Sequence, residues 1–208
     1  MRGGILPREN DFVAEYDLIN HFVMLYEGNI DLVQGLDAVV EAARLVVDDS
    51  EICFGFVGVG AGRKGLVEKA RQLGLSDVSF ISYQPRERMP EVFATADISL
   101  VILRKGTGFG ALPSKIYQIL STARPVIVSV DEGSDTWDLI ERAKVGLCAP
   151  PENPSKLADA ILTLKKDQLL RERLAPNGRI WAVRYHPSES AAEQFEKLLL
   201  AAFSSKKL

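Results

Sequence analysis

The segment 106–115 contains residue types that could together bind a phosphate group. Three alternate glycines follow an apolar run, and a serine and a lysine stand where a helical pattern begins. These residues are Gly106, Gly108, Gly110, Ser114 and Lys115. Backbone N–H groups in such a loop, together with the positive end of a helix, favour an anion. We therefore interpret the segment as a phosphate-binding loop with Lys115 as the candidate catalytic residue, while Ser114 is open between a helix N-cap and a phosphate contact.

The elements that would position this loop follow from the pattern of apolar residues. Short apolar runs alternate with helical patterns, as in a parallel sheet that is buried on both faces. Strands are expected at 22–26, 52–57, 78–81, 98–103, 125–130 and 146–149. Helices are expected at 34–47, 62–73, 89–96, 114–122, 136–143, 155–165, 168–185 and 188–202. The sequence predicts an α/β fold, a Rossmann-like, doubly wound parallel sheet of about six strands with helices on both faces and C-terminal helices.

Two further glycine-rich turns follow predicted strands at the same edge of this sheet. Gly28 and Asn29 follow the first strand, and residues 58–62, which include Gly58 and Gly60, follow the second. Ligands of open parallel sheets bind outside the carboxyl ends of the strands. We therefore expect the turns and the loop to form one site.

The segment 60–65 matches the pattern G-x-G-x-x-G, but its surroundings disfavour dinucleotide binding. Such a site also needs an acidic residue near the end of the next strand, where this chain has Ser-Tyr-Gln at 82–84. A Walker A loop is excluded because the lysine of the segment is followed by glycine and not by serine or threonine. No cofactor is expected.

Composition limits the classes of partner. The chain has 208 residues and a formal net charge of −3, which gives no bulk attraction to nucleic acid. Its two cysteines, Cys53 and Cys148, lie in apolar runs and are expected as buried free thiols, and no metal-ligand spacing is present. Two such cysteines make no disulfide framework, so a reducing cytoplasm is the expected compartment. No apolar run approaches transmembrane length.

Short motifs occur in an order that resembles a known family. They lie at 26–30 with 34–36, and at 56–60, 78–80, 89–91, 96–98, 113–117 and 124–127. In this order they resemble the C-terminal, nucleotide-sugar-binding half of retaining glycosyltransferases of the two-domain GT-B type, the glycosyl transferases group 1. The Pro-Ser-Lys-Ile-Tyr motif at 113–117 resembles the subgroup that acts in surface-polysaccharide assembly.

The resemblance implies a donor-binding domain of an enzyme that transfers a hexose, with retention, from a nucleoside diphosphate sugar to a glycan or lipid-linked acceptor. Uridine diphosphate is the nucleotide that the family favours. The resemblance also implies diphosphate or donor-sugar contacts from Gly28, Asn29, Gly108, Gly110 and Lys115, backbone approach to the nucleotide at Gly58 and Gly60, base contacts from Tyr83 and Gln84, and a ribose contact from Gln118.

Two departures from the family pattern keep alternatives open. Many relatives carry a pair of glutamates where this chain has Gly110 and Gln118, and a lysine where it has Gln34. Lys115 would then carry more of the phosphate neutralisation, helped by one of two arginines, Arg63 or Arg104. The alternative function is a non-catalytic nucleotide- or partner-binding module that kept the fold and lost the chemistry. A sugar-phosphate epimerase is a weaker rival, since it needs paired carboxylates and a histidine in the cleft.

The expected domain organisation has three parts. Residues 1–20 are expected to form a linker, ending in a short helical turn, from a missing N-terminal acceptor domain. Residues 21–186 are expected to form the nucleotide-sugar-binding domain, and residues 187–208 a C-terminal helix and tail. We expect this chain alone to bind a nucleotide weakly and to transfer no sugar. Peripheral membrane association of the full-length enzyme is left open.

Overall fold

The computed structural model describes residues 8–110 and 112–185. Within this part the strands form a six-stranded parallel sheet in the order β3-β2-β1-β4-β5-β6. The strands are β1 (Phe22–Glu27), β2 (Ile52–Val57), β3 (Val78–Ile81), β4 (Ile98–Ile102), β5 (Val126–Ser129) and β6 (Gly146–Ala149). Each strand begins and ends within one residue of the range expected from the sequence. The predicted Rossmann-like parallel sheet is confirmed.

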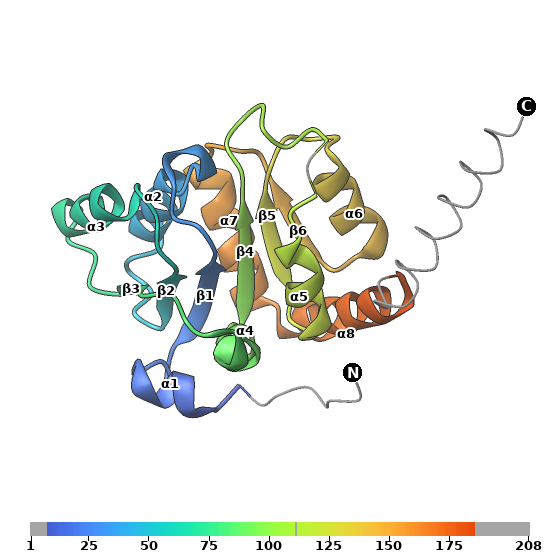
Figure 1. The fold of residues 1–208 in the computed structure, drawn as a ribbon, viewed down its shortest axis with the longest axis horizontal. Helices are drawn as coiled ribbons and strands as arrows, with labels where there is room; N and C mark the ends of the chain where they lie inside the picture. The colour runs from blue at the N-terminus through green and yellow to red at the C-terminus, as the bar shows by residue number, and fades with distance from the viewer. Residues whose placement is uncertain (1–7, 111, 186–208) are drawn as a thin grey trace, which may run out of the picture.

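Helices cover both faces of the sheet, and Figure 1 shows α4 and α5 in front of it and α7 behind it. The helices are α1 (Asp11–Glu15), α2 (Asp37–Leu45), α3 (Arg63–Gln72), α4 (Met89–Thr95), α5 (Lys115–Ser121), α6 (Asp135–Ala143), α7 (Pro154–Lys166) and α8 (Gln168–Tyr185). Two 3₁₀ turns, η1 (Leu32–Gln34) and η2 (Arg86–Arg88), precede α2 and α4. The side chains of α2, α3 and α7 fill one apolar layer, and those of α1, α4, α5 and α6 fill the opposite layer.

The helix expected at 34–47 is shorter in the structure because of Gly35. This residue has a φ of +69°, a left-handed conformation that ends η1 and precedes α2. A Cβ atom at Gly35 would also lie 3.5 Å from the Cα atom of Arg104, so the turn packs closely against the loop after β4. The left-handed turn therefore replaces the first residues of the expected helix.

The strands are apolar at consecutive positions because both faces of the sheet are covered. Along β1, Val23 and Leu25 pack with α1 and α4, whereas Met24 and Tyr26 pack in the layer of α2, α3 and α7. All six residues of β2 are buried. Strands that are buried on both faces need apolar residues at every position, so they appear in the sequence as uninterrupted apolar runs.

The N-terminal helical turn is present and forms part of the core. Asn10 caps α1 by accepting hydrogen bonds from the backbone N–H groups of Phe12 and Val13, and both of these side chains are fully buried. Arg8 adds a 3.0 Å ion pair with Asp97, the residue that precedes β4. The part of residues 1–20 that the structure describes is therefore packed against the sheet.

The predicted C-terminal helix at 188–202 lies outside the described residues, as do residues 1–7, 111 and 186–208 as a whole. In the part of the chain that the structure describes, no helix combines the length and the apolar character that crossing a membrane would require.

Candidate functional site

The order of the strands determines where a ligand site should lie. The chain leaves β1 toward α2 on one face of the sheet, and it leaves β4 toward α5 on the other face. Because β1 and β4 are neighbours, these two connections diverge at the carboxyl ends of adjacent strands. Open parallel sheets bind ligands at such switch points. The topology therefore places the candidate site at the carboxyl ends of β1 and β4.

Lys115 reaches across this switch point from α5. The apolar face of α5 is buried in the core, which fixes the rotation of the helix and leaves Lys115 directed toward β1. The Nζ atom donates a 2.8 Å hydrogen bond to the backbone carbonyl oxygen of Glu27. It also lies 4.2 Å from the centroid of the Tyr26 ring, a cation–π contact. A helix on one side of the crevice thus supplies a cation to the strand on the other side.

Burial lowers the pKa of Lys115 to about 8, and the Glu27 carboxylate opposes this shift only in part. Burial raises the pKa of Glu27, and the charge of Lys115 acts in the opposite direction. An ammonium group has three N–H donors, of which the Glu27 carbonyl accepts one. An anion beside this amine would raise the pKa of Lys115 again, since an opposite charge favours the protonated form.

The turns after β1 and β2 are in direct backbone contact, and their glycines make this contact possible. The N–H group of Gly28 donates a 3.0 Å hydrogen bond to the Val57 carbonyl oxygen. A Cβ atom would lie 1.9 Å from the Gly28 carbonyl oxygen at Gly58, and 2.3 Å from the Ile30 carbonyl oxygen at Gly60. These distances admit only glycine. Gly58 and Gly60 therefore hold the two turns together, whatever they contribute to a ligand.

Gly28 and Asn29 border the lysine. A Cβ atom at Gly28 would lie 2.9 Å from Nζ of Lys115, so the amine rests directly against this glycine. The Tyr26 hydroxyl donates a 2.8 Å hydrogen bond to the carbonyl oxygen of Asn29. The exposed Asn29 side chain donates a 2.7 Å bond to Asp31. Tyr26, Gly28, Asn29 and Lys115 consequently form one contiguous group at the switch point.

The glycine loop after β4 differs from the sequence prediction in one respect. The N–H group of Gly106 donates to both carboxylate oxygens of Asp131, at 3.0 and 2.9 Å, and the N–H group of Gly108 donates to one of them at 3.1 Å. Asp131 lies two residues after the end of β5 and is 8% exposed. The expectation of unpaired donors is therefore wrong for these two amides, because a carboxylate of the protein already holds them.

The remaining predicted residues of this loop and of α5 are open to solvent. Gly110 is exposed and has a φ of +70°. Ser114 occupies the N-cap position of α5, but its side chain makes no capping hydrogen bond. Gln118 is exposed and lies one helical turn beyond Ser114 and Lys115, so the three can share one side of the helix. The structure leaves the Ser114 hydroxyl and the Gln118 amide accessible from solvent.

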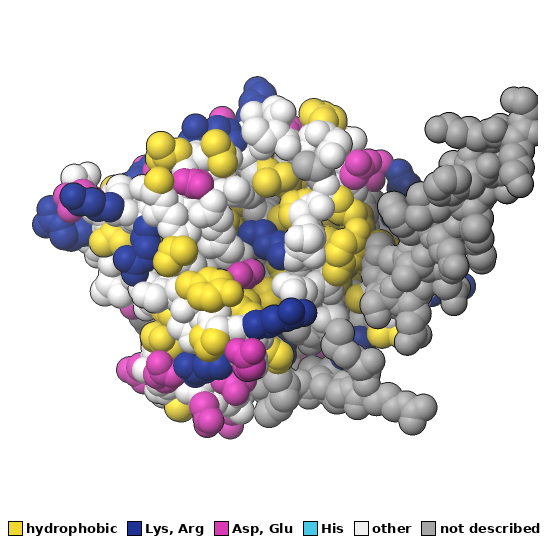
Figure 2. Space-filling view, in the orientation of Figure 1, with side chains coloured by type: hydrophobic (Ala, Val, Ile, Leu, Met, Phe, Trp, Pro, Cys, Tyr) yellow, Lys and Arg dark blue, Asp and Glu magenta, His cyan; other side chains and the backbone are white. Residues whose placement is uncertain are grey.

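Tyr83 and Gln84 follow β3 and differ in orientation. The Tyr83 side chain is 65% exposed, whereas Gln84 is 7% exposed. The Gln84 amide bonds to the Tyr16 hydroxyl at 3.3 Å and accepts a 3.2 Å bond from Arg88. Gln84 thus secures the segment between β3 and α4 to α1, where acidic side chains gather at the lower left of Figure 2. The structure does not bring Gln84 to the lysine group.

The two arginines suggested as helpers of Lys115 have other partners. Arg63 donates a 2.9 Å hydrogen bond to the carbonyl oxygen of Phe80 in β3. Arg104 forms a 3.3 Å ion pair with Glu152. Lys115 is therefore the basic residue that the structure positions against β1.

Three residues of the site were not among the predicted ones. Tyr26 and Glu27 end β1 and contact the lysine, and Asp131 organises the loop after β4. The motif at 26–30 already included the first two, although no role was assigned to them. Asp131 could have been found by its position, since it is an acidic residue shortly after a buried strand.

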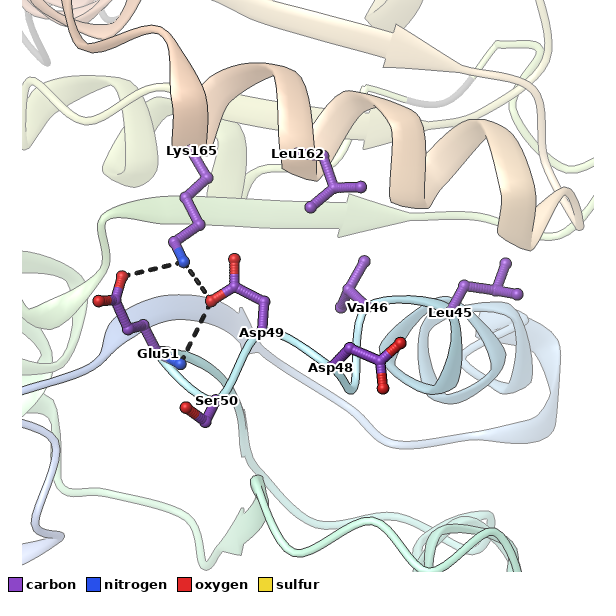
Figure 3. Close-up of a pocket in the computed structure, with 8 residues that line it drawn as sticks. All are labelled: Leu45, Val46, Asp48, Asp49, Ser50, Glu51, Leu162 and Lys165. Atoms are coloured by element: carbon purple, nitrogen blue, oxygen red, sulfur yellow. Dashed lines mark hydrogen bonds and ion pairs between the residues drawn. The ribbon is translucent and has the colours of Figure 1, made fainter.

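A hollow of about 520 Å³ lies at the opposite edge of the sheet, between α2, α7 and the loop before β2. Figure 3 shows Lys165 directed at two carboxylates there, those of Asp49 and Glu51. This cation already has its partners, and the amino ends of parallel strands are not where such folds bind ligands. The hollow therefore does not compete with the switch point as a candidate site.

Comparison with known proteins gives the family. Residues 14–181 match the family described as Glycosyl transferases group 1. The chain belongs to this family. Its membership accounts for the glycine turns, the Pro-Ser-Lys-Ile-Tyr motif and the parallel sheet together, and it confirms the resemblance found in the sequence.

Relatives and solved structures agree with this assignment. The chain is 30% identical over 177 residues to the putative colanic acid biosynthesis glycosyl transferase WcaI of Escherichia coli, covering 85% of this chain and 42% of that protein. It superimposes on Anabaena HepE in complex with UDP with a TM-score of 0.81, at 18% identity, covering 91% of this chain and 51% of HepE.

It also resembles the C-terminal domain of the Francisella tularensis group 1 protein LpcC, with a TM-score of 0.69 at 21% identity, covering 87% of this chain and 95% of that domain. The chain spans less than half the length of WcaI. The match to the isolated LpcC domain therefore concerns one half of the two-domain GT-B fold.

Proposed function

We propose that this chain binds the nucleoside diphosphate sugar donor of a glycosyltransferase, and that the nucleotide is UDP. The observation that carries the proposal is the Lys115 amine, held at the switch point against the Glu27 carbonyl oxygen and the Gly28 backbone. A cation at this edge of a parallel sheet is suited to an anionic ligand. The structure of HepE, which has the same fold, contains UDP. The uridine nucleotide bound to HepE supports UDP as the nucleotide that this chain binds.

The chemical role proposed for Lys115 is to stabilise the departing diphosphate. When the bond between the anomeric carbon and the phosphate oxygen breaks, negative charge grows on that oxygen. A preorganised ammonium group lowers the free energy of this charged state more than that of the bound donor. Charge-assisted hydrogen bonds contribute about 1.5–3 kcal/mol each, enough to change the rate substantially. Transfer of a hexose with retention to a surface glycan or lipid-linked acceptor completes the proposal.

The base and ribose are proposed to lie on either side of Lys115. The exposed Tyr83 after β3 offers an aromatic surface for the base, and the exposed Gln118 on α5 offers an amide for a ribose hydroxyl. Ser114 supplies a hydroxyl next to the lysine. These roles account for predicted residues that make no internal contact essential to the fold.

The proposal is tested by measuring nucleotide binding to the full 208-residue chain. Binding is measured and not sugar transfer, because the chain spans only part of the length of its relatives. Calorimetric titration should detect UDP and give weaker affinity for GDP and ADP. Lys115→Met should lower the affinity for UDP about tenfold or more, since it removes one charge-assisted contact. Lys166→Met is the matched control, because this exposed lysine ends α7 on another part of the surface. Equal UDP affinity in both variants and the wild type would contradict the proposal.

The alternative function is a binding module without transferase chemistry. The specific observation in its favour is that Gly110 and Gln118 offer no carboxylate to the donor sugar. Comparison of UDP with UDP-glucose separates the two. A donor site should bind UDP-glucose and UDP with different affinities, because the sugar makes contacts of its own. A module that recognises another ligand should show the same affinity for each nucleotide in Lys115→Met as in the wild type.

A further inference from the structure

Asp131 makes contacts that its place in the sequence does not explain. Its backbone carbonyl accepts a 3.1 Å hydrogen bond from the N–H group of Ser134 and so forms the turn between β5 and α6. Its side chain points away from that turn, into the neighbouring loop after β4. There the carboxylate accepts the N–H groups of Gly106 and Gly108. A single residue therefore joins two adjacent loops at the ligand-binding edge of the sheet.

The loop that Asp131 holds is long, and its beginning is anchored by the Leu103 N–H group, which donates to the Ser129 carbonyl oxygen, and by the ion pair of Arg104 with Glu152. It runs from the end of β4 at Ile102 to the start of α5 at Lys115. Connections of this length without secondary structure are uncommon in compact domains and are often functional. The loop leads into α5, whose apolar face is buried. Further along its first half, the carboxylate holds the N–H groups of Gly106 and Gly108, which offsets part of the conformational entropy cost of about 1–2 kcal/mol per ordered residue.

The packing around Gly108 shows how closely the loop follows the carboxylate. A Cβ atom at Gly108 would lie 3.1 Å from Oδ2 of Asp131 and 3.3 Å from its backbone nitrogen. Gly108 is buried, and its φ is outside the left-handed region. Glycine is needed here for space and not for backbone conformation. A methyl group at this position would therefore press on the carboxylate and on the backbone beside it.

We propose that Asp131 is a positioning residue of the donor site. It holds Gly106 and Gly108 in the loop that leads to Lys115, and it occupies their amides so that they are not the phosphate donors. Loss of the carboxylate releases the loop and weakens nucleotide binding without removing any group that touches the nucleotide. This inference rests on the proposed function, because it assigns a role within the same site.

The test uses Asp131→Asn in the full chain. Asparagine keeps the shape of the side chain but turns one acceptor into an N–H donor that faces the loop amides. The matched control is Glu132→Gln, which removes the same charge from the exposed neighbouring residue. Two quantities are measured for each protein: the amide resonances of Gly106 and Gly108 in ¹⁵N-glycine-labelled protein, and the affinity for UDP by calorimetry.

The expected result is specific to Asp131. In Asp131→Asn the resonances of Gly106 and Gly108 shift strongly, those of Gly28, Gly58 and Gly60 do not, and the affinity for UDP falls about tenfold. Glu132→Gln leaves both quantities at wild-type values. Shifted glycine resonances with unchanged affinity in Asp131→Asn would overturn the positioning role alone. Failure of the wild-type chain to bind UDP would instead reject the proposed function, and the inference with it.

A second variant keeps the proposal testable if Asp131→Asn does not fold. Gly108→Ala breaks the contact from the loop side while leaving Asp131 in place to form the turn before α6. It should weaken UDP binding to a similar extent. Gly65→Ala is its control, since a Cβ atom there would meet nothing within 4 Å. Wild-type affinity in Gly108→Ala would overturn the inference.

Discussion

At the scale of single residues, the site depends on one ammonium group with a restricted environment. Lys115 touches a carbonyl oxygen, an aromatic ring and a glycine, and burial lowers its pKa to about 8. Burial raises the pKa of the neighbouring Glu27, and among the described residues its carboxylate forms no ion pair with Lys115. This arrangement leaves the amine available for an external anion. It also makes the charge of the site sensitive to pH near neutrality.

The first prediction concerns the pH dependence of nucleotide binding. Because Lys115 loses its proton as the pH rises through about 8, the affinity for UDP should decrease between pH 7 and pH 9. Binding of the diphosphate should raise the pKa of Lys115 and therefore take up protons near pH 8.5. Calorimetry in buffers of different ionisation enthalpy measures this uptake. The absence of proton uptake in the wild type, or an equal uptake in Lys115→Met, would contradict the prediction.

The second prediction concerns Gly28. Alanine at this position would place a Cβ atom 2.9 Å from Nζ of Lys115, in a backbone conformation with φ of +139° that alanine rarely adopts. We expect Gly28→Ala to displace the amine and lower the affinity for UDP about tenfold. Gly65→Ala serves as the control and should bind normally. Unchanged affinity in Gly28→Ala would show that the lysine does not need this position.

At the scale of elements, each part of the site is held by structure on a different face of the sheet. α5 presents Lys115 from one face, while the interlocked turns after β1 and β2 fix the carbonyl that it contacts. The segment after β3 is fastened by Gln84 and Arg88 to α1, and Arg88 pairs with Glu15 at 2.8 Å. α1 thus supports the side of the site where Tyr83 lies. Its own stability depends on one capping residue.

The third prediction tests this support. Asn10→Ala removes the acceptor for the first backbone N–H groups of α1 and should lower the free energy of unfolding by about 1 kcal/mol. Asn10→Asp keeps the acceptor at the cap but loses the side-chain amide that donates to the carbonyl oxygens of Arg8 and Glu91, so its loss should be smaller than that of Asn10→Ala but not zero. Urea denaturation followed by circular dichroism measures both. A loss of the same size in the two variants would mean that the cap is not the cause.

At the scale of the whole molecule, two apolar layers form the core on either side of the sheet. Cys53 is buried but Cys148 is only half-buried, so the prediction of two buried thiols is correct for Cys53 alone. Burial raises the pKa of Cys53 and of Cys148 to about 12, against an ordinary value of 9.0. The folded protein therefore keeps the thiols protonated at a pH where the unfolded chain ionises them. Their contribution to stability is complete below pH 9 and is lost as the pH rises toward 12.

The fourth prediction follows from this difference. The free energy of unfolding should fall between pH 9 and pH 10, by about 1 kcal/mol for the buried Cys53 and by less for the half-buried Cys148, where solvent screens the charge. Cys53→Ala should show a less steep fall than the wild type, although it is less stable below pH 9 because of the cavity. Urea denaturation at several pH values gives the two slopes. Parallel slopes would contradict the raised pKa of the thiol.

The sequence alone determined the fold and predicted where the candidate site lies. A strand with apolar residues at consecutive positions can bury all of them only in a sheet that is covered on both faces. The local sequence pattern was therefore enough to predict the strand ranges and the edge of the sheet at which the glycine turns lie. Lys115, Gly28 and Asn29 were found in the same way, since residue type and position after a strand carry the signal.

The tertiary structure decided which groups were already in use. Asp131 meets Gly106 from a strand that is distant in sequence, and Gln84 meets Tyr16 across the packed face of the sheet. Contacts of this kind depend on which loops adjacent strands bring together. These contacts decide whether the backbone N–H groups of the loop and the Gln84 side-chain amide are available to bind a ligand. No local pattern in the sequence encodes such contacts.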